Sequence, residues 1–266
     1  MDAKSDSGHL MLITPERVFY AGLLGRPRER CPGALHVYVS IQGGLRMTTG
    51  DGQNCGELFA VRPNVRHTIT SDFRSAICFV IEPESVAAGA FDALAEWLSG
   101  PGGRLVACRV RAAYDRLREL QHRDGITSAE LDVMCFGEAL AARALDPRVA
   151  KSIAQIDTFC GEPVTAASCA ATAGLSSSRF LHLFKQQTGI SFRAFRAWKR
   201  ARHLLHYANQ NINLAHLAQD IGYPDSTHFS HSIRRFYGLK PRAIFSGSRD
   251  LAIYRSGRVD REVAIS

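Results

Sequence analysis

Two stretches of the carboxy-terminal half carry mostly polar side chains at the spacing of a single helix face. The first set is Ser178, Leu181 and His182, and the second set is Thr227, Ser230, His231 and Arg234. Residues three, four and seven positions apart lie on the same side of an α-helix. Hydroxyl, imidazole and guanidinium groups on such a face can hydrogen-bond to base edges and phosphates of a duplex. The chemistry that these residues predict is therefore recognition by hydrogen bonding rather than covalent catalysis.

Both stretches belong to a motif that occurs twice. The first copy is Ala170, Gly174, Leu175, Ser176, Arg179, Phe180, Phe184, Lys185 and Gly189, and the second is Ala218, Gly222, Tyr223, Asp225, His228, Phe229, Ile233, Arg234 and Gly238. From the polar cap residue onward the copies align without gaps at an offset of 49 positions. Each copy predicts a short helix, a glycine turn, a polar cap and a second helix, which together form a helix-turn-helix. The expected helices are 166–173 and 177–188, capped by Thr165 and Ser176, and 214–221 and 226–237, capped by Asn213 and Asp225.

Further side chains flank the two polar faces. Basic and polar residues that we expect to contact phosphates or base edges are Arg179, Lys185, Gln186, Ser226 and Arg235. Aromatic residues such as Phe180 and Phe229 lie on the opposite sides of the same helices and predict faces that are fixed in a core. One buried face and one free face are what a recognition helix in a major groove requires.

A connecting helix is expected over 191–208. At 1.5 Å per residue its length is about 27 Å, close to the roughly 34 Å between successive major grooves on one side of B-DNA. Its basic stripe consists of Arg193, Arg196, Arg200 and His203. Three interpretations fit this stripe: a solvated face, contacts with the DNA backbone, and packing between the two motifs. We include Arg200 among the expected DNA contacts.

The charge of the chain also favours a nucleic-acid partner. The chain has 266 residues and a net charge of +8, but residues 1–146 hold 16 Lys and Arg against 18 Asp and Glu, whereas residues 147–266 hold 17 against 7. A basic back half is typical of a protein that contacts a polyanion, although it also favours solubility. The seven cysteines are scattered without a CxxC pair, which favours buried free thiols over a disulfide framework, a zinc site or a redox sensor.

Several other classes of protein are disfavoured. No apolar run approaches a membrane span and Met1–Gly8 lacks the pattern of a signal peptide, so we expect a cytoplasmic protein with no membrane partner. Binding to DNA would place it at the nucleoid. The sequence has no GxSxG, P-loop, HExxH or paired Cys/His signature, so we expect no enzyme activity, no catalytic residues and no cofactor. The competing hypotheses are a metal-dependent barrel catalyst with a basic tail and a general architectural DNA binder. The different polar residues on the two recognition faces favour sequence-specific binding over the architectural alternative.

The front of the chain predicts short strands followed by helices. Expected strands are 17–21, 35–41, 45–48, 57–61, 67–70 and 75–81, and expected helices are 84–98, 110–121 and 128–145. Short strands separated by turn residues are typical of a β-barrel or jelly roll. The apolar stripe of the third helix fits packing on its own domain and a subunit interface equally well. Asp146-Pro147 is the expected domain boundary because a residue before proline disfavours helix, and the next helix is expected over 148–160.

The carboxy-terminal pattern resembles a known family. Residues from about 148 to 247 are similar to the DNA-binding domain of the AraC/XylS family of bacterial transcription regulators. The residues that carry the resemblance are Ala170, Gly174-Leu175-Ser176, Phe180, Phe184-Lys185, Gly189, Arg200, the run 218–230 and the run 234–241. Tyr223 and Ile233 stand where the family usually has Phe, and both stay apolar. The resemblance implies an α+β protein, with a cupin-like β-barrel and helical extension over 1–146 and an all-α domain with two helix-turn-helix motifs over 147–266.

The same resemblance implies the role of the front domain. Such a barrel would sense a small effector or mediate homodimerisation. Candidate effector-binding residues alternate along the expected strands and are His36, Tyr38, Arg46, Arg62 and His67. Because His67 and the distant His36 form no HxH cluster, a metal site is disfavoured. The implied partners are promoter DNA, bound through two adjacent major grooves, and RNA polymerase; activation is the expected outcome, with repression as the alternative.

Overall fold

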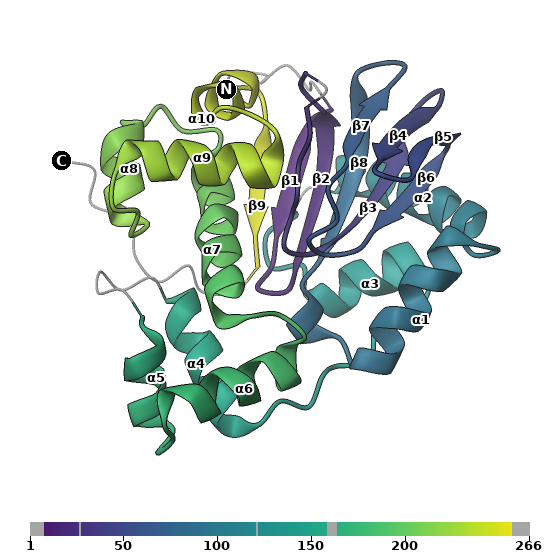
Figure 1. Ribbon diagram of the computed structural model, residues 1–266. Coiled ribbons are helices and arrows are strands. Elements are labelled where there is room, and N and C mark those ends of the chain that lie inside the picture. Colours follow the sequence, from purple (N-terminus) through teal and green to yellow (C-terminus); the bar gives the residue numbers. More distant parts are fainter. Residues whose placement is uncertain (1–7, 27, 121, 159–163, 257–266) are drawn as a thin grey trace.

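The larger of two β-sheets forms the centre of the molecule in a computed structural model that describes residues 8–26, 28–120, 122–158 and 164–256 (Figure 1). Its strand order is β6-β3-β8-β2-β1-β9. These strands are β1 (Leu10–Ile13), β2 (Arg17–Leu23), β3 (Leu35–Ser40), β6 (Leu58–Val61), β8 (Ser75–Ile81) and β9 (Ala252–Arg255). All neighbours pair antiparallel except β9, which runs parallel to β1. A smaller sheet holds β4 (Leu45–Thr49), β5 (Gly52–Gly56) and β7 (Thr68–Ser71) in the order β5-β4-β7.

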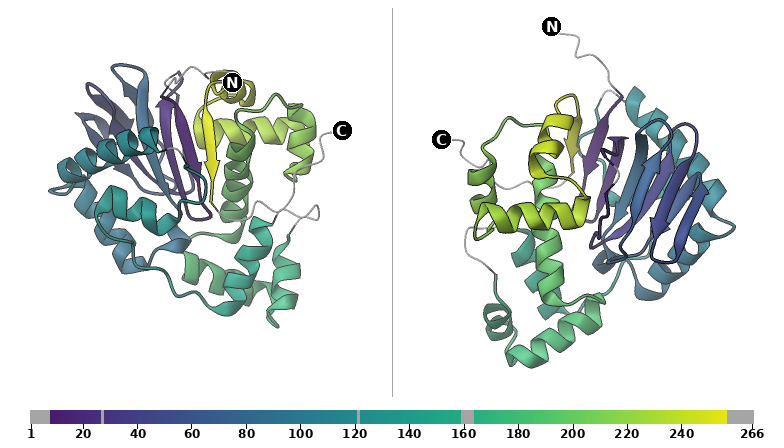
Figure 2. Two further views of the ribbon diagram at one scale, coloured as in Figure 1. Left: turned by 180° about the vertical axis from the view of Figure 1, so that it is seen from behind. Right: turned by 45° about the horizontal axis from the view of Figure 1, so that its top comes forward.

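Alternation along the strands gives the larger sheet two apolar faces. Phe19, Val37 and Phe79 lie on the face that is covered by three helices. These helices are α1 (Ala88–Ser99), α2 (Gly103–Glu119) and α3 (Ser128–Phe136). Val18 and Tyr38 point to the opposite face, where the carboxy-terminal helices pack. The sheet therefore separates a helical layer of the front half from the carboxy-terminal half (Figure 2).

The expected closed barrel is wrong, whereas the mixed α+β class is confirmed. In the part of the chain that the structure describes, the six-stranded and three-stranded sheets do not join into one closed sheet. The physical reason is that helices α1–α3 cover one face and the carboxy-terminal helices cover much of the other. The large sheet thus buries its apolar residues without curling onto itself.

The expected helices of the front half differ from those observed. A 3-10 turn, η1 (Pro83–Ser85), replaces the start of the helix expected from Glu84. The second helix begins at Gly103 instead of Val110, and Gln121, its expected end, lies outside the described residues. The third helix ends at Phe136 because Gly137 turns the chain with a left-handed φ of 94°. The segment beyond it forms an isolated bridge between Ala142 and Val86.

The apolar stripe of α3 packs inside the front domain. Leu131 and Cys135 are fully buried against the large sheet. Leu145, which was expected on the same helix, lies beyond the end of α3 and packs against the core of the first helix-turn-helix. The structure therefore favours internal packing over a subunit interface for the described part of this stripe.

The carboxy-terminal half consists of short helices. They are α4 (Pro147–Asp157), α5 (Ala166–Thr172), α6 (Ser177–Thr188), α7 (Phe192–His203), η2 (Leu204–Tyr207), α8 (Leu214–Asp220), α9 (Ser226–Tyr237) and α10 (Pro241–Gly247). The start of α4 coincides with the expected boundary, and Cys160, the expected end of that helix, lies outside the described residues. The connecting helix is shorter than expected, because it continues after His203 as the 3-10 segment η2. None of the described helices has the length and apolar composition that crossing a bilayer requires.

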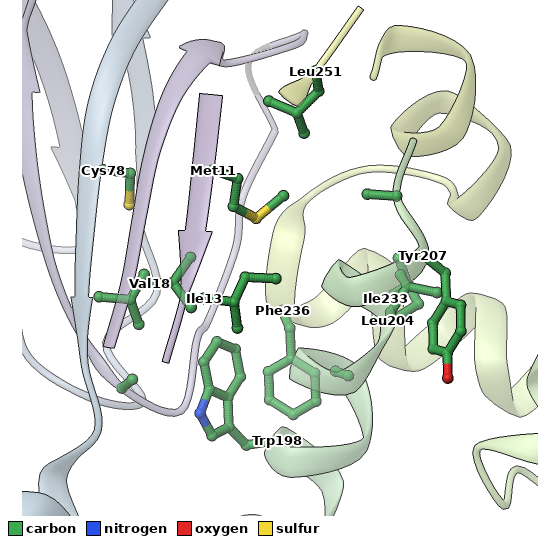
Figure 3. Packing of buried hydrophobic residues seen from close by; sticks show 14 of the residues in the cluster. Met11, Ile13, Val18, Cys78, Trp198, Leu204, Tyr207, Ile233, Phe236 and Leu251 are labelled. Carbon is green, nitrogen blue, oxygen red and sulfur yellow. The ribbon is translucent and has the colours of Figure 1, made fainter. Parts of the chain in front are cut away.

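The two halves share one apolar core (Figure 3). Met11, Ile13 and Val18 on the large sheet belong to the same cluster as Trp198 and Phe236 on α7 and α9. The tail that follows α10 then returns to the front half, where β9 pairs with β1. The segment 252–255 of the expected second domain is therefore part of the first domain's sheet.

Candidate nucleic-acid interface

Helix α6 carries the first polar face. The Ser176 hydroxyl accepts a hydrogen bond from the Arg179 backbone NH at the start of the helix, and Gly189 ends it with a φ of 76°. Phe180 and Phe184 are fully buried in the aromatic core of this motif. The six expected contact residues on α6 are all exposed: Ser178, Arg179, Leu181, His182, Lys185 and Gln186.

Helix α9 carries the second polar face. Asp225 Oδ1 accepts hydrogen bonds from the backbone NH groups of Thr227 and His228, each at 2.8 Å. Hydrogen bonds from the His228 backbone and ring hold the pKa of the Asp225 carboxyl below its usual range. The buried side consists of Phe229, Ile233 and Phe236. Of the expected contacts, Ser226, Thr227, His231, Arg234 and Arg235 are exposed and Ser230 is half-buried.

Both polar faces are attached to one central helix. Helix α7 packs against α6 near one of its ends and against α9 further along (Figures 1 and 2). Phe192 and Phe195 of α7 belong to the core of the first motif, and Trp198 belongs to the core of the second. A short rigid helix with an anchor in each core fixes the distance between the two recognition helices.

Arg200 is held by the second motif instead of pointing freely outward. Its Nη1 donates to the Gly222 carbonyl at 2.8 Å, and its guanidinium lies 5.1 Å from the centre of the Tyr223 ring. Gly222 is the left-handed residue of the turn before α9, with a φ of 82°. Of the alternatives for the basic stripe, these contacts favour packing between α7 and the second motif. Arg193 of the same stripe is exposed, and Arg196 stacks on Phe192.

A groove beside α6 adds a residue that the sequence reasoning missed. The groove has a volume of about 440 Å³. Its lining consists of Arg148, Leu175, Ser178, Arg179, His182, Leu183 and Gln186. Arg148 comes from α4 and pairs with Asp146 at 2.7 Å. The sequence signal was weak, because Arg148 lies well outside the repeated motif.

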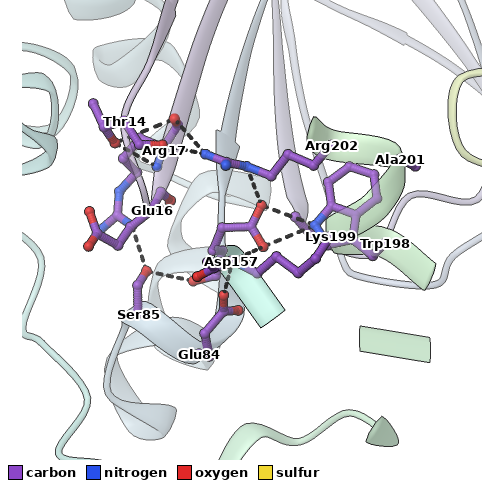
Figure 4. Close-up of polar contacts among 12 residues, drawn as sticks. Thr14, Glu16, Arg17, Glu84, Ser85, Asp157, Trp198, Lys199, Ala201 and Arg202 are labelled. Carbon is purple, nitrogen blue, oxygen red and sulfur yellow. Dashed lines mark hydrogen bonds and ion pairs between the residues drawn. The ribbon is translucent and has the colours of Figure 1, made fainter. Parts of the chain in front are cut away.

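A buried charge cluster joins α7 to the front half (Figure 4). Lys199 Nζ lies 2.7 Å from Glu84 Oε1 and 3.7 Å from Glu82 Oε2, and Arg202 Nε lies 2.9 Å from Glu82 Oε1. Burial alone would lower the pKa of Lys199, but the carboxylates of Glu84, Glu82 and Asp157 raise it above its usual value. Lys199 therefore stays charged, and the cluster fixes α7 on the large sheet.

The expected effector residues do not all meet at one place. His36 and Tyr38 line an apolar cavity of about 200 Å³ between the large sheet and helices α9 and α10. His67 is buried but does not line this cavity, and its Nε2 lies 3.0 Å from the Tyr38 hydroxyl. Arg46 lies exposed on β4 of the smaller sheet, and Arg62 is on the surface, where it pairs with Asp92.

Arg30 is a charged residue of the cavity lining that sequence reasoning missed. Its side chain is 8% exposed and lines the cavity, and its Nε has no hydrogen-bond partner in the described structure. Its neighbours in the lining are mostly apolar, and the lining contains no Asp or Glu. Burial lowers the pKa of His36 to about 3, so that this ring is neutral near pH 7. The described residues hold no cluster of three or more His, Cys, Asp or Glu side chains that could bind a metal.

Two helix-turn-helix motifs on a rigid connector, with exposed polar faces, form the arrangement that is typical of a double-headed DNA-binding domain. Residues 169–246 match a family model that is described as a helix-turn-helix domain. The chain is 32% identical over 111 residues to the HTH-type transcriptional activator RhaS of Escherichia fergusonii. This match spans 41% of the chain and 39% of the relative's length. The carboxy-terminal half is therefore similar to the DNA-binding domains of AraC/XylS-type transcriptional regulators, as its sequence pattern predicts.

Solved structures share the whole fold. An apo single-residue variant of ToxT from Vibrio cholerae matches with a TM-score of 0.56 at 10% sequence identity, over 87% of this chain and 97% of that one. ToxT from Vibrio cholerae O395 matches with a TM-score of 0.53 at 11% identity, over 88% and 98%. The combination of a front β-sheet domain with a double helix-turn-helix is therefore a known architecture.

Proposed function

We propose that this protein is a sequence-specific transcription regulator that places α6 and α9 in adjacent major grooves of a promoter. The observation that carries the proposal is the pair of exposed polar faces that α7 holds apart. The 12 residues of α7 and 4 of η2 span about 26 Å at 1.5 and 2.0 Å per residue. That length is close to the groove repeat of roughly 34 Å, and modest bending of the DNA can close the difference.

The two recognition helices would contribute unequally to specificity. The α9 face presents Thr227, His231 and Arg234, each of which can hydrogen-bond to a base edge or a phosphate. The α6 face has Leu181, 40% exposed, at its centre. An apolar side chain there suits contact with a thymine methyl group. We therefore expect the half-site read by α9 to carry most of the sequence information.

Binding measurements on mapped sites test this proposal. Genome-wide mapping of bound DNA supplies candidate promoters, and fluorescence anisotropy then compares a mapped duplex with a scrambled duplex of the same composition. We expect the mapped site to bind about 10³-fold more tightly or better, with affinity falling steeply as salt rises. Equal affinity for the mapped and scrambled duplexes would contradict specific regulation.

We extend the proposal to activation through RNA polymerase. The name of the relative RhaS describes a transcriptional activator, and a regulator of this kind would act at the nucleoid in the cytoplasm. In vitro transcription from a mapped promoter, with and without the protein, distinguishes activation from repression. Homodimerisation through the front domain stays a prediction, and sedimentation of the free and DNA-bound protein checks it.

The effector that we propose is an amphipathic anion held in the cavity between the two halves. Apolar walls suit a hydrocarbon chain, and the buried Arg30 guanidinium has no carboxylate among the described lining residues. ToxT, which shares the fold with a TM-score of 0.51, has also been solved with an unsaturated fatty acid bound. Because Phe236, Tyr237 and Leu239 line the same cavity, an occupant would touch the end of α9 and could change its DNA affinity.

Titration calorimetry with oleate tests the effector proposal. We expect oleate to bind with one site per chain, and methyl oleate, which lacks the carboxylate, to bind at least about tenfold more weakly. Arg30→Met, which keeps a long apolar side chain, should remove the difference between the two ligands. Equal affinity of the wild-type protein for oleate and methyl oleate would contradict an anion site at Arg30.

A further inference from the structure

The front domain touches the end of the second recognition helix. The backbone NH of Cys31 donates to the Arg235 carbonyl at 2.7 Å. A Cβ placed on Gly238 would lie 2.9 Å from the Arg28 carbonyl oxygen and 3.2 Å from that of Glu29. A Cβ on Gly25 would in turn lie 2.9 Å from the Leu239 side chain. The backbone around residues 28–31 is therefore in close contact with the carboxy-terminal end of α9.

This contact brings basic side chains of the two halves together. Arg26 and Arg28 are exposed, as are Arg234 and Arg235 of α9 and Lys240 and Arg242 of the segment that follows. Glu29, which lies beside Arg28 in the chain, is paired with Arg66 at 2.6 Å. In the structure as described, Arg26 and Arg28 form no ion pair with a carboxylate. The front domain, which is nearly neutral as a whole, thus presents two arginines without an ion-pair partner in the described structure, beside the end of α9 that we expect to contact phosphates.

We propose that Arg26 and Arg28 of the front domain extend the DNA interface by binding backbone phosphates beside the half-site read by α9. This inference rests on the proposed DNA binding. Arginine is suited to the role because its planar guanidinium can donate two hydrogen bonds to one phosphate. Contacts of this kind fix register and add affinity, but they carry no base information.

If Arg26 and Arg28 bind phosphates, the front domain would act directly on DNA affinity. The buried Arg30, which faces the cavity, follows Arg28 by two residues, and its backbone is fixed to His67 by hydrogen bonds of 2.9 and 3.0 Å. A change in the cavity would therefore be transmitted to Arg28 along the backbone. The DNA contact of the front domain and its effector site would share one short segment of chain.

The test uses the full-length protein with the double variant Arg26→Gln/Arg28→Gln. Arg116→Gln on α2 is the control, because Arg116 is exposed on the opposite side of the large sheet. Fluorescence anisotropy is recorded for a mapped site and a scrambled duplex over a salt series. We expect the double variant to bind both duplexes about three- to tenfold more weakly and to lower the salt slope by about one to two units. The ratio between mapped and scrambled affinities should stay at the wild-type value.

The outcomes separate this inference from the proposed function. If wild-type protein does not prefer the mapped site, the proposed regulation fails. If wild-type protein prefers it and the double variant keeps wild-type affinity and salt slope, only the contact by Arg26 and Arg28 is overturned. Arg26→Lys/Arg28→Lys retains the charge and should recover most of the affinity. Failure of the lysine variant to recover it, together with a lowered unfolding midpoint, would assign the loss to folding and overturn the contact.

Discussion

The indole Nε1 of Trp198 lies 3.0 Å from both carboxylate oxygens of Glu82. Glu82 is fully buried at the end of β8, and it also pairs with Arg202 of α7. Lys199 of the same helix lies 3.7 Å from it, so that one carboxylate of the front half contacts three side chains of the connector between the two helix-turn-helix motifs. Removal of one partner from a buried ion pair leaves the other charge unpaired, and this is the main cost of such a change.

Glu82→Ala should therefore lower the free energy of unfolding by about 3 to 5 kcal/mol. Urea unfolding followed by circular dichroism measures this change. Glu57→Ala is the matched control, because Glu57 pairs with Arg111 near the surface and is 38% exposed; its loss should cost about 1 kcal/mol or less. Similar losses in the two variants would show that the Glu82 cluster does not hold the two halves together.

Buried histidines predict a loss of stability in mild acid. Burial lowers the pKa of His36 to about 3 and that of His67 to about 4, whereas both would titrate near 6.5 in the unfolded chain. At a pH between the folded and unfolded pKa values, the unfolded state binds more protons than the folded state. The free energy of unfolding therefore falls as the pH drops below about 6.5. Each such histidine can contribute a slope of up to about 1.4 kcal/mol per pH unit.

Unfolding at pH 7.5 and pH 5.5 checks this prediction. His67→Gln removes one of these groups and should reduce the stability difference between the two pH values. His231→Gln, on the exposed face of α9, is the control and should leave the difference unchanged. Wild-type stability that is equal or higher at pH 5.5 would contradict the neutral, buried state of these rings.

Strand β9 should stabilise the edge of the large sheet. The Ala252 NH donates to the His9 carbonyl at 3.1 Å, and the Leu251 carbonyl accepts from Asn209 Nδ2 at 3.0 Å. Because proline has no NH, Ala252→Pro should lower stability by about 1 to 3 kcal/mol. Hydrogen exchange should also be faster in a peptide that covers β1. Ala252→Val keeps the NH and serves as the control. Equal protection of β1 from hydrogen exchange in the Pro and Val variants would show that β9 does not stabilise the sheet edge.

Local patterns were sufficient to predict the helix-turn-helix motifs. The caps Thr165, Ser176, Asn213 and Asp225 all accept hydrogen bonds from the backbone at the start of their helices. The exposed recognition faces were predictable for the same reason, since helix periodicity fixes which residues oppose the buried aromatics. These features depend on neighbours in the sequence and not on distant contacts.

Features that depend on long-range contacts were missed. Leu10–Ile13 is a short apolar run buried on both faces, without the alternation that marks a half-buried strand. Gly52–Gly56 has residues of low strand propensity and is ordered by pairing with β4. The position of β9 beside β1, and that of Arg30 in the cavity, result from tertiary packing that no spacing rule encodes.

His231 and Arg235 should differ in their contributions to DNA binding. His231 is exposed at the centre of the α9 face, whereas Arg235 lies near the end of the helix, where a phosphate contact is expected. His231→Ala should cost about 1 to 3 kcal/mol on the mapped site and little on a scrambled duplex, because a base contact discriminates sequence. Arg235→Ala should weaken binding to both duplexes equally and lower the salt slope by about one unit. Anisotropy titrations of both variants measure these effects, and a change of preferred sequence in Arg235→Ala would reverse the two roles.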